Sequence, residues 1–494
     1  MGEKFVQNKF SRRGFTKALV TGALVVGFDS ATGSWITSAH AASVSDFDKL
    51  PPLDGTLYLD EATRTEYAQD YGQVIHEQPL AVLKPGSLED ICRVVRFARR
   101  HKIRIAARGQ GHLPFGQAQV SGGLVIDMRS LQQIHAVSGD RLEADAGIQW
   151  RALVKAAFDR GLMPPVLTGY LGLTVGGTLS IGGISPTTYR HGAQVDNTLE
   201  LQVVTGEGEV VTCSDARNRD LFEAALAGQG QCAIITRAVV RLIPAPTKVR
   251  EYVLLYPDLT TLIKDAAQLA DDGRFDGASA FIVPSPGGGW LYFLLPTSNF
   301  TPPHTPDDAA LLAGLGYLPG AKQVNDYGYL EYVDSIPNVT FSASRPDMTL
   351  CVPASAATTF TGALLSRLTP NDLGTASVIQ LFFWPRAPFT RPLFRLPDED
   401  IFGLAILRTQ TTDPSVVDRM LAGNREMFEQ NRSLGGTHYP FSAVQLSRDD
   451  WERHYGPHWD KLAQAKRRYD PKNVFASGPD IFLKHRTCDP PTKS

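Results

Sequence analysis

The stretch Arg108-Gly-Gln-Gly-His-Leu-Pro-Phe-Gly-Gln-Ala118 decides the fold of this chain. Its glycines bracket one histidine, His112, and apolar runs at 103–107 and 122–127 predict a strand on either side. In a glycine loop between strands, no Cβ keeps a ligand away from the backbone N–H groups, so these groups can bind a phosphate. We therefore expect a phosphate-containing ligand that His112 also contacts. Taken alone, the loop is equally compatible with a tight turn that carries a surface histidine.

Length and composition set broad limits on the function. A chain of 494 residues predicts two or three structural units with real hydrophobic cores. Its 49 Lys and Arg balance 51 Asp and Glu, which gives no electrostatic case for nucleic acid as a partner. The five cysteines are scattered without metal-ligand spacing, so we expect neither a disulfide scaffold nor a metal site.

The first residues have the pattern of an export signal. Ser11-Arg-Arg-Gly-Phe-Thr-Lys17 precedes a short apolar run, and Ala39-His-Ala41 has the form of a cleavage site. The paired arginines predict a twin-arginine signal peptide over residues 1–41. No later segment is apolar for long enough to span a membrane. We expect a secreted or periplasmic protein that is exported already folded around its cofactor.

Short strands and helices alternate over the first half of the chain. Strands are predicted at 81–83, 141–146, 199–205, 209–212 and 233–243, and helices at 87–101, 149–161 and 220–227. This pattern predicts an α+β unit that ends at the prolines of 244–246.

The middle of the chain, residues 247–433, has a different texture. Proline and glycine clusters separate aromatic strands such as 290–295 and 379–384, which predicts a second domain built on a sheet. The aromatic face of that sheet is either core or the wall of a substrate site, and core is the simpler interpretation. Near the end, residues 451–466 predict a helix.

A second glycine cluster occupies residues 169–192. It carries hydroxyls at Thr174, Thr178 and Ser180, which predicts an extended backbone lying against a polar ligand. Packing alone would not need those hydroxyls at the same place. The cluster lacks the G-x-G-x-x-G dinucleotide fingerprint and its acidic residue.

Together these stretches resemble the vanillyl-alcohol-oxidase-type (PCMH-type) FAD-linked oxidoreductases, and the cytokinin dehydrogenases above all. The resemblance is carried by 108–118, by Tyr170-Leu-Gly-Leu-Thr-Val-Gly-Gly-Thr-Leu-Ser180, by Arg190-His-Gly192 and by the tail at 469–482. It is strong over 79–246, fades through the middle and returns from about residue 451. It implies an α+β, two-domain flavoprotein. The FAD-binding domain would comprise 42–246 with the segment 434–494 returning to it, and the substrate domain 247–433 would carry a mixed or antiparallel sheet.

The resemblance also implies a cofactor and a reaction. His112 holds the position of the histidine that the family bonds covalently to FAD, and a second cysteinyl link is not expected because no cysteine lies between Cys92 and Cys213. A small organic substrate would give hydride to the flavin, and oxygen or a quinone-like acceptor would reoxidise it. The expected cofactor-binding residues are Arg108, Gly109, Gln110, Gly111, His112, Leu113, Gln117, Ala118, Thr174, Gly177, Ser180, Ile184 and Ile235.

One departure from the family bears on the substrate. Cytokinin dehydrogenases carry a proton-accepting aspartate just before the tyrosine of the second cluster, and this chain has Gly169 there. The stretch that matches the family's partner glutamate, 291–296, is apolar. Cytokinin oxidation is the default expectation, and an alcohol, sugar or secondary-metabolite oxidase is the alternative. A flavin-binding protein without turnover is the third reading.

The catalytic residue therefore stays unknown at this point. His191 has the acid–base chemistry to replace the missing aspartate, but a structural role fits it better because family members keep both. Tyr170 is more simply read as lining the site than as an acid or base. His454 and His458 have ligand spacing, but Gly456-Pro457 lies between them and breaks the helix that a metal pair would need.

Overall fold

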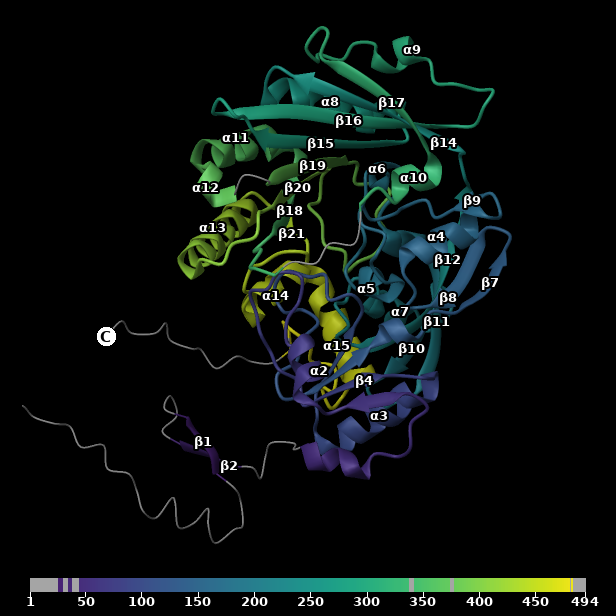
Figure 1. Ribbon diagram of the computed structural model, residues 1–494, viewed down its shortest axis with the longest axis vertical. Helices are drawn as coiled ribbons and strands as arrows, with labels where there is room; N and C mark the ends of the chain where they lie inside the picture. The colour runs from purple at the N-terminus through teal and green to yellow at the C-terminus, as the bar shows by residue number, and fades with distance from the viewer. Residues whose placement is uncertain are drawn as a thin grey trace, which may run out of the picture.

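The computed structural model describes residues 25–29, 34–37, 44–336, 342–373, 377–479 and 481–482. Most of the predicted export signal, including Arg12-Arg13 and Ala39-His-Ala41, lies outside these residues. The part that is described is the backbone of an antiparallel pair, β1 (Val25–Asp29) and β2 (Ser34–Thr37). From residue 44 onward the chain builds one α+β unit, then a second unit on a larger sheet, and finally returns to the first (Figure 1).

The first unit begins with a four-stranded sheet in the order β3-β4-β6-β5. Its strands are β3 (Thr56–Tyr58), β4 (Ala81–Lys84), β5 (Ile105–Arg108) and β6 (Leu124–Asp127), and the last three run parallel. Helix α3 (Leu88–His101) starts where the sequence predicts it, because the Ser87 hydroxyl accepts the Asp90 N–H as an N-cap. The glycine loop therefore leaves the sheet at the carboxyl end of β5.

The second sheet of this unit has five antiparallel strands in the order β11-β10-β12-β8-β7. They are β7 (Ile134–Ser138), β8 (Arg141–Asp145), β10 (Thr198–Thr205), β11 (Val210–Ser214) and β12 (Ala233–Arg241). The helices here are α2 (Glu61–Glu66), α4 (Trp150–Phe158), α5 (Val175–Leu179), α6 (Thr188–His191) and α7 (Arg219–Ala225). A short pair, β9 (Leu162–Met163) and β13 (Ile243–Pro244), closes the unit.

The second unit is built on an eight-stranded antiparallel sheet in the order β17-β14-β16-β15-β19-β20-β18-β21. Its strands are β14 (Lys248–Tyr256), β15 (Gly277–Pro284), β16 (Trp290–Phe300), β17 (Lys322–Gly328), β18 (Met348–Pro353), β19 (Val378–Trp384), β20 (Ile401–Leu407) and β21 (Thr437–His438). The helices are α8 (Leu259–Asp272), α9 (Asp308–Leu312), α10 (Tyr329–Val333), α11 (Ala357–Arg367), α12 (Pro370–Leu373) and α13 (Pro414–Ser433).

We expected a mixed or antiparallel sheet in the second unit, and all of its strand pairs are antiparallel. Helix α8 packs against β14, β15, β16 and β19 and covers one face. Strand β21 extends the sheet, so the chain still belongs to the second unit just after residue 434, where the sequence placed the return to the first.

The last helices return to the first unit (Figure 1). The helix predicted over 451–466 is two helices, α14 (Arg448–Tyr455) and α15 (Trp459–Tyr469). The predicted break at Gly456-Pro457 is confirmed, because proline removes a backbone donor there. The Lys466 ammonium donates hydrogen bonds to the Gln231 and Phe475 carbonyls and pairs with Asp470, each at 2.7 Å. This buried pair anchors the return segment.

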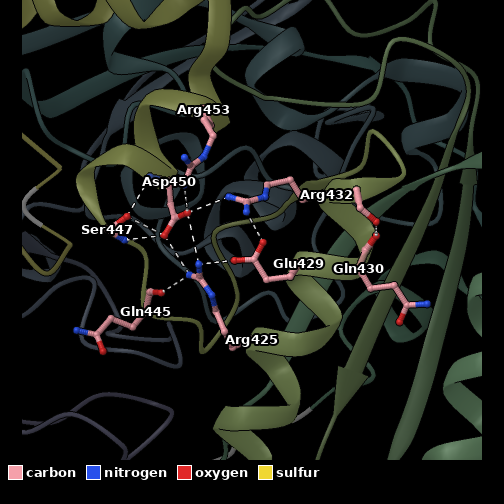
Figure 2. Close-up of polar contacts among 9 residues, drawn as sticks. Arg425, Glu429, Gln430, Arg432, Gln445, Ser447, Asp450 and Arg453 are labelled. Atoms are coloured by element: carbon pink, nitrogen blue, oxygen red, sulfur yellow. Dashed lines mark hydrogen bonds and ion pairs between the residues drawn. The ribbon is translucent and has the colours of Figure 1, made fainter. Parts of the chain in front are cut away.

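Asp450 joins α13 to α14 (Figure 2). Its carboxylate, only 3% exposed, lies 3.0 Å from Arg425, 2.9 Å from Arg432 and 2.8 Å from Arg453. Burial opposes ionisation, but the hydrogen bonds from Arg425, Arg453 and Ser447 hold the pKa of Asp450 well below its ordinary value. The cluster therefore links the second unit to the return segment with an ionised group at neutral pH.

The described cysteines, Cys92, Cys213, Cys232 and Cys351, are buried and free. Within the described ranges, no cluster of His, Cys, Asp and Glu side chains has the makings of a metal site. None of the helices described is both long enough and apolar enough to cross a membrane.

Candidate functional site

A cavity of about 770 Å³ opens between the two units, lined by both. The first unit contributes the glycine loop after β5, the region of α5 and part of β12. The second contributes the face of the large sheet opposite α8, and α10 with the residues just after it. A volume of this size suits a cofactor or a small-molecule ligand.

Every residue of the expected cofactor set lines this one cavity. These are Arg108, Gly109, Gln110, Gly111, His112, Leu113, Gln117, Ala118, Thr174, Gly177, Ser180, Ile184 and Ile235. The structure thus brings together residues from the loop, the second glycine cluster and β12.

The glycine loop presents free backbone donors to the cavity. None of the N–H groups of residues 109–113 donates a hydrogen bond to another described residue. Gly111 has φ +63°, a conformation that L side chains rarely adopt. A Cβ on Gly109 would lie 2.1 Å from Thr174 Oγ1, so the two glycine clusters approach each other too closely for any other residue. Such a run of unpaired donors fits a diphosphate.

His112 sits among aromatic rings at the edge of the cavity. Its ring centroid lies 4.2 Å from that of Tyr71 and 5.0 Å from that of Tyr170. Burial, and secondarily the positive charge of Arg345, lowers the pKa of His112 to about 4. No described residue hydrogen-bonds its ring nitrogens. The imidazole is therefore neutral at physiological pH, with a lone pair available for bonding to a ligand.

Arg108 is the sole cation among the described residues that line the cavity. It donates a hydrogen bond to the Tyr67 carbonyl at 3.1 Å, and its guanidinium lies 5.3 Å from the Tyr67 ring centroid. A positive charge fixed beside the unpaired N–H groups adds to the attraction for an anionic ligand.

The second glycine cluster differs from its sequence interpretation. We expected an extended backbone, but Thr174 caps a short helix, α5, by accepting the Gly177 N–H. The hydroxyls also have partners in the protein: Ser180 donates to the Gly176 carbonyl at 2.8 Å, and Thr178 accepts from Trp150 at 2.8 Å. Serine and threonine favour such local bonds. Packing and capping therefore account for the hydroxyls that we had assigned to a ligand.

Gln117 is likewise engaged by the protein. Its side-chain amide donates to the Pro440 and Ser442 carbonyls at 3.0 and 3.3 Å, and its oxygen accepts the Phe115 N–H. It lines the cavity while tying the glycine loop to the chain just beyond β21.

The large sheet supplies the rest of the cavity wall, which is mostly apolar. Phe281, Leu295 and Phe382 line the cavity, whereas their neighbours Leu294 and Leu381 belong to the core. The aromatic strands therefore provide core on one face and ligand wall on the other. Both roles that the sequence offered as alternatives are therefore present, because alternate residues of a strand point to opposite faces.

The candidate bases from the sequence do not complete the site. His191 lines a separate, smaller cavity of about 420 Å³ and not the large one. Gly169 and Tyr170 do line the large cavity, but glycine has no side chain to accept a proton. His454 packs against the His438 ring at 4.7 Å, and burial lowers its pKa, so it is a core residue.

Two polar residues that sequence reasoning missed also line the cavity: Glu251 on β14 and Ser279 on β15. The alternation of side chains along β14 could have indicated Glu251, because it lies on the same strand face as Val249, which also lines the cavity. Neither residue belongs to a recognisable motif, and only the strand order brings them to the same wall.

Comparison with known proteins agrees with this architecture. Residues 79–214 match the family model described as "FAD binding domain", and residues 283–482 match "Cytokinin dehydrogenase 1, FAD and cytokinin binding". The "Uncharacterized oxidoreductase ORF5 in fasciation locus" of Rhodococcoides fascians is 36% identical over 86% of this chain and 99% of its own length. "Cytokinin dehydrogenase 4" of Oryza sativa subsp. japonica is 32% identical over 87% and 91%, and "Cytokinin dehydrogenase 4" of Arabidopsis thaliana is 30% identical over 93% and 98%.

The fold and the site define a two-domain, PCMH-type FAD-linked oxidoreductase. The chain belongs to the cytokinin dehydrogenase family. The expected family, fold class and enzyme class are confirmed.

Proposed function

We propose that FAD binds in the large cavity with a covalent bond to His112, and that a small, largely apolar organic molecule is oxidised against the sheet wall. The observation that carries the proposal is the neutral, unpartnered His112 ring beside the free N–H groups of residues 109–113. The cavity continues from there onto the apolar sheet, so cofactor and substrate would occupy one continuous space.

The residues present fit the cofactor by their chemistry. The loop N–H groups and Arg108 would hold the diphosphate, and the neutral imidazole of His112 would supply the nitrogen for the covalent bond. FAD, when bound, supplies a two-electron acceptor for hydride. Phe281, Leu295 and Phe382 exclude water from the substrate side and orient an apolar substrate.

The substrate class follows from the wall and from the relatives. A cytokinin-like amine is the first candidate, because several relatives carry the name cytokinin dehydrogenase. An alcohol, a sugar or a secondary metabolite is the second, and Gly169 is the observation that favours it. Oxygen or a quinone-like acceptor would take the electrons afterwards.

Anaerobic single-turnover flavin reduction tests the proposal. The holoprotein is mixed with N6-isopentenyladenine, benzylamine, benzyl alcohol and glucose in separate runs, and the loss of flavin absorbance is followed. Bleaching by the amines supports the first candidate, and bleaching by the alcohol or sugar alone supports the second. Dithionite-reducible flavin that none of the four compounds bleaches would contradict both substrate assignments.

Export is part of the same proposal. The pair Arg12-Arg13 and the segment Ala39-His-Ala41 support twin-arginine transport to a secreted or periplasmic location. Replacing Arg12 and Arg13 by lysine should leave the precursor in the cytoplasm while its flavin content stays unchanged. Undiminished export of that variant would contradict the proposal.

A further inference from the structure

One carboxylate belongs to the sheet wall of the large cavity, where the substrate is proposed to bind. Glu251 lies on β14, and it is the sole Asp or Glu among the described residues that line this cavity. It lies on a different strand from the apolar stretch 291–296, which matches the family's partner glutamate and contains no acidic residue.

Glu251 differs from the buried carboxylates that serve the fold. Asp90 accepts the N–H groups of Asp54, Gly55 and Gly86, and Asp470 pairs with Lys466. The Glu251 carboxylate has no hydrogen bond or ion pair with another described residue, and burial raises its pKa. Glu251 is half-buried in the cavity wall and has no protein partner there, so its carboxylate is free to bind a ligand.

A second unpaired polar group lies on the same wall. The Ser279 side chain on β15 is 5% exposed and lines the cavity, and its Oγ has no partner. Glu251 is opposite Thr297 in the sheet register, and Ser279 is opposite Leu295. The two therefore flank β16 with an offset of two residues along the strand, about 12 Å apart at the usual strand spacing and rise.

Helix α10 and the residues just after it lie near both Glu251 and Gly169. Tyr332 on α10 interacts with Glu251, and the chain then continues to Ile336. The Ile336 side chain lies 3.6 Å from the point where a Cβ on Gly169 would be. Gly169 and Glu251 thus flank the same segment, one from each unit.

We propose that Glu251 is the catalytic residue that accepts the substrate proton, and that Ser279 hydrogen-bonds a second polar group of the same substrate. This inference rests on the proposed function. Gly169 has no side chain that could accept a proton, and the Glu251 carboxylate on β14 would accept it instead.

The step balances with the flavin as oxidant. The substrate C–H bond breaks and its electron pair leaves with the hydrogen as hydride for the bound flavin. The N–H or O–H proton passes to the Glu251 carboxylate as the C=N or C=O bond forms. An ionised Glu251 is required at the start and is protonated at the end.

The wall also narrows the substrate class. Between Glu251 and Ser279 the cavity wall presents Leu295 and Phe281, and the Thr297 hydroxyl beside them already donates to the Gly277 carbonyl. A sugar would leave most of its hydroxyls without partners on such a wall, which is costly. The substrate is therefore an apolar amine or alcohol with a second polar group on its far side.

Replacement of Glu251 tests the inference. Glu251→Gln should slow flavin reduction by the bleaching amine or alcohol about a hundredfold to ten-thousandfold, the usual contribution of a positioned acid–base group. Glu251→Asp should keep a measurable rate, and the exposed Glu209→Gln should match the unmutated protein. Equal rates for Glu251→Gln and the unmutated protein would overturn the inference.

The pH profile separates a base from a structural role. Tyr332 is the titratable group that faces Glu251, and burial raises the pKa of Tyr332 far above neutrality. The register partners of Glu251 on the adjacent strands, Thr297 and Asn325, do not titrate. In the unmutated protein the rate of flavin reduction should fall at acidic pH as Glu251 becomes protonated. The pH profile of Glu251→Gln should lack this acid limb. An unchanged acid limb in Glu251→Gln would overturn the inference. If Glu251→Gln does not fold, a shifted limb in Glu251→Asp decides the same question.

Carboxyl labelling gives a readout that needs no turnover. N,N′-diisopropylcarbodiimide reacts with protonated carboxyl groups, so at mildly acidic pH the holoprotein should be labelled at Glu251, as mapped by peptide mass spectrometry. Unlabelled Glu251 would overturn the inference. If no tested compound bleaches the flavin although Glu251 is labelled, the substrate assignments fail while the accessible carboxyl stands.

Discussion

The Tyr71 hydroxyl donates a hydrogen bond to Asp347 Oδ2 at 2.8 Å, which links the two units beside the cavity. Asp347 is fully buried, and its other oxygen accepts the Arg408 N–H at 2.7 Å. The Tyr71 ring in turn contacts His112. A buried carboxylate of the second unit therefore holds the ring that packs beside His112, the proposed flavin attachment site.

Tyr71→Phe should destabilise the protein by about 1–3 kcal/mol, because it removes one donor from a buried carboxylate. Covalent attachment of flavin should also become slower, because the ring beside His112 is less firmly held. Thermal melting of the holoprotein and the fraction of flavin bound after denaturation measure the two effects. Tyr58→Phe is the control, and equal melting temperatures for both variants would contradict the first effect.

His112→Ala should abolish covalent flavin attachment while leaving the cavity intact. Acid precipitation of the unmutated protein should give a yellow pellet, and the variant should lose nearly all of its flavin to the supernatant. His76→Ala, at an exposed position, is the matched control. A colourless pellet from the unmutated protein would show that His112 makes no covalent bond.

The sequence identified many of the first-unit residues that line the cavity but missed those that the large sheet contributes. Residues 108–118 contain enough glycines to identify a loop locally, and 170–180 combine glycines with hydroxyls. The close approach of the two stretches at Gly109 and Thr174 is visible only in the folded chain.

The rest depends on pairing between distant residues. Glu251 meets its neighbours only because β14 lies beside β16, and Tyr71 reaches Asp347 across 276 residues of sequence. Strand order and register are set by the whole sheet, so no local pattern reveals them. The same limit applies to 174–180, where capping by Thr174 turned an expected extended ligand platform into a short helix.

Asp450→Asn should lower the melting temperature at neutral pH, because Arg425, Arg432 and Arg453 lose a shared anion. The folded pKa of Asp450 lies well below the ordinary value of 3.8, so its stabilisation is present above that value and is lost as pH falls toward the folded pKa. The melting difference between the unmutated protein and the variant should therefore be constant from pH 7 to 5 and shrink below pH 4. Asp449→Asn, exposed on the same helix, should show no such difference. A difference that stays constant into acid would contradict this assignment.

Gly169→Asp should raise the rate of flavin reduction by N6-isopentenyladenine. The backbone at Gly169 does not have positive φ, and a Cβ there would make only an ordinary contact with Ile336 at 3.6 Å, so aspartate fits without strain. By the resemblance, the family's aspartate takes the amine proton at this position, so Gly169→Asp would add a second carboxylate to the one that Glu251 supplies. A positioned base contributes about a hundredfold to ten-thousandfold.

We expect the lower end of that range for Gly169→Asp, because the sheet wall still has to accept the adenine ring. Anaerobic stopped-flow absorbance measures the rate, and Gly169→Ala fills the same Cβ position without a carboxylate. A gain in Gly169→Asp but not in Gly169→Ala would show that the missing aspartate limits cytokinin oxidation. Equal rates in both variants would place the limit in the fit of the ring between β14, β15 and β16, and would favour the alcohol or metabolite substrate.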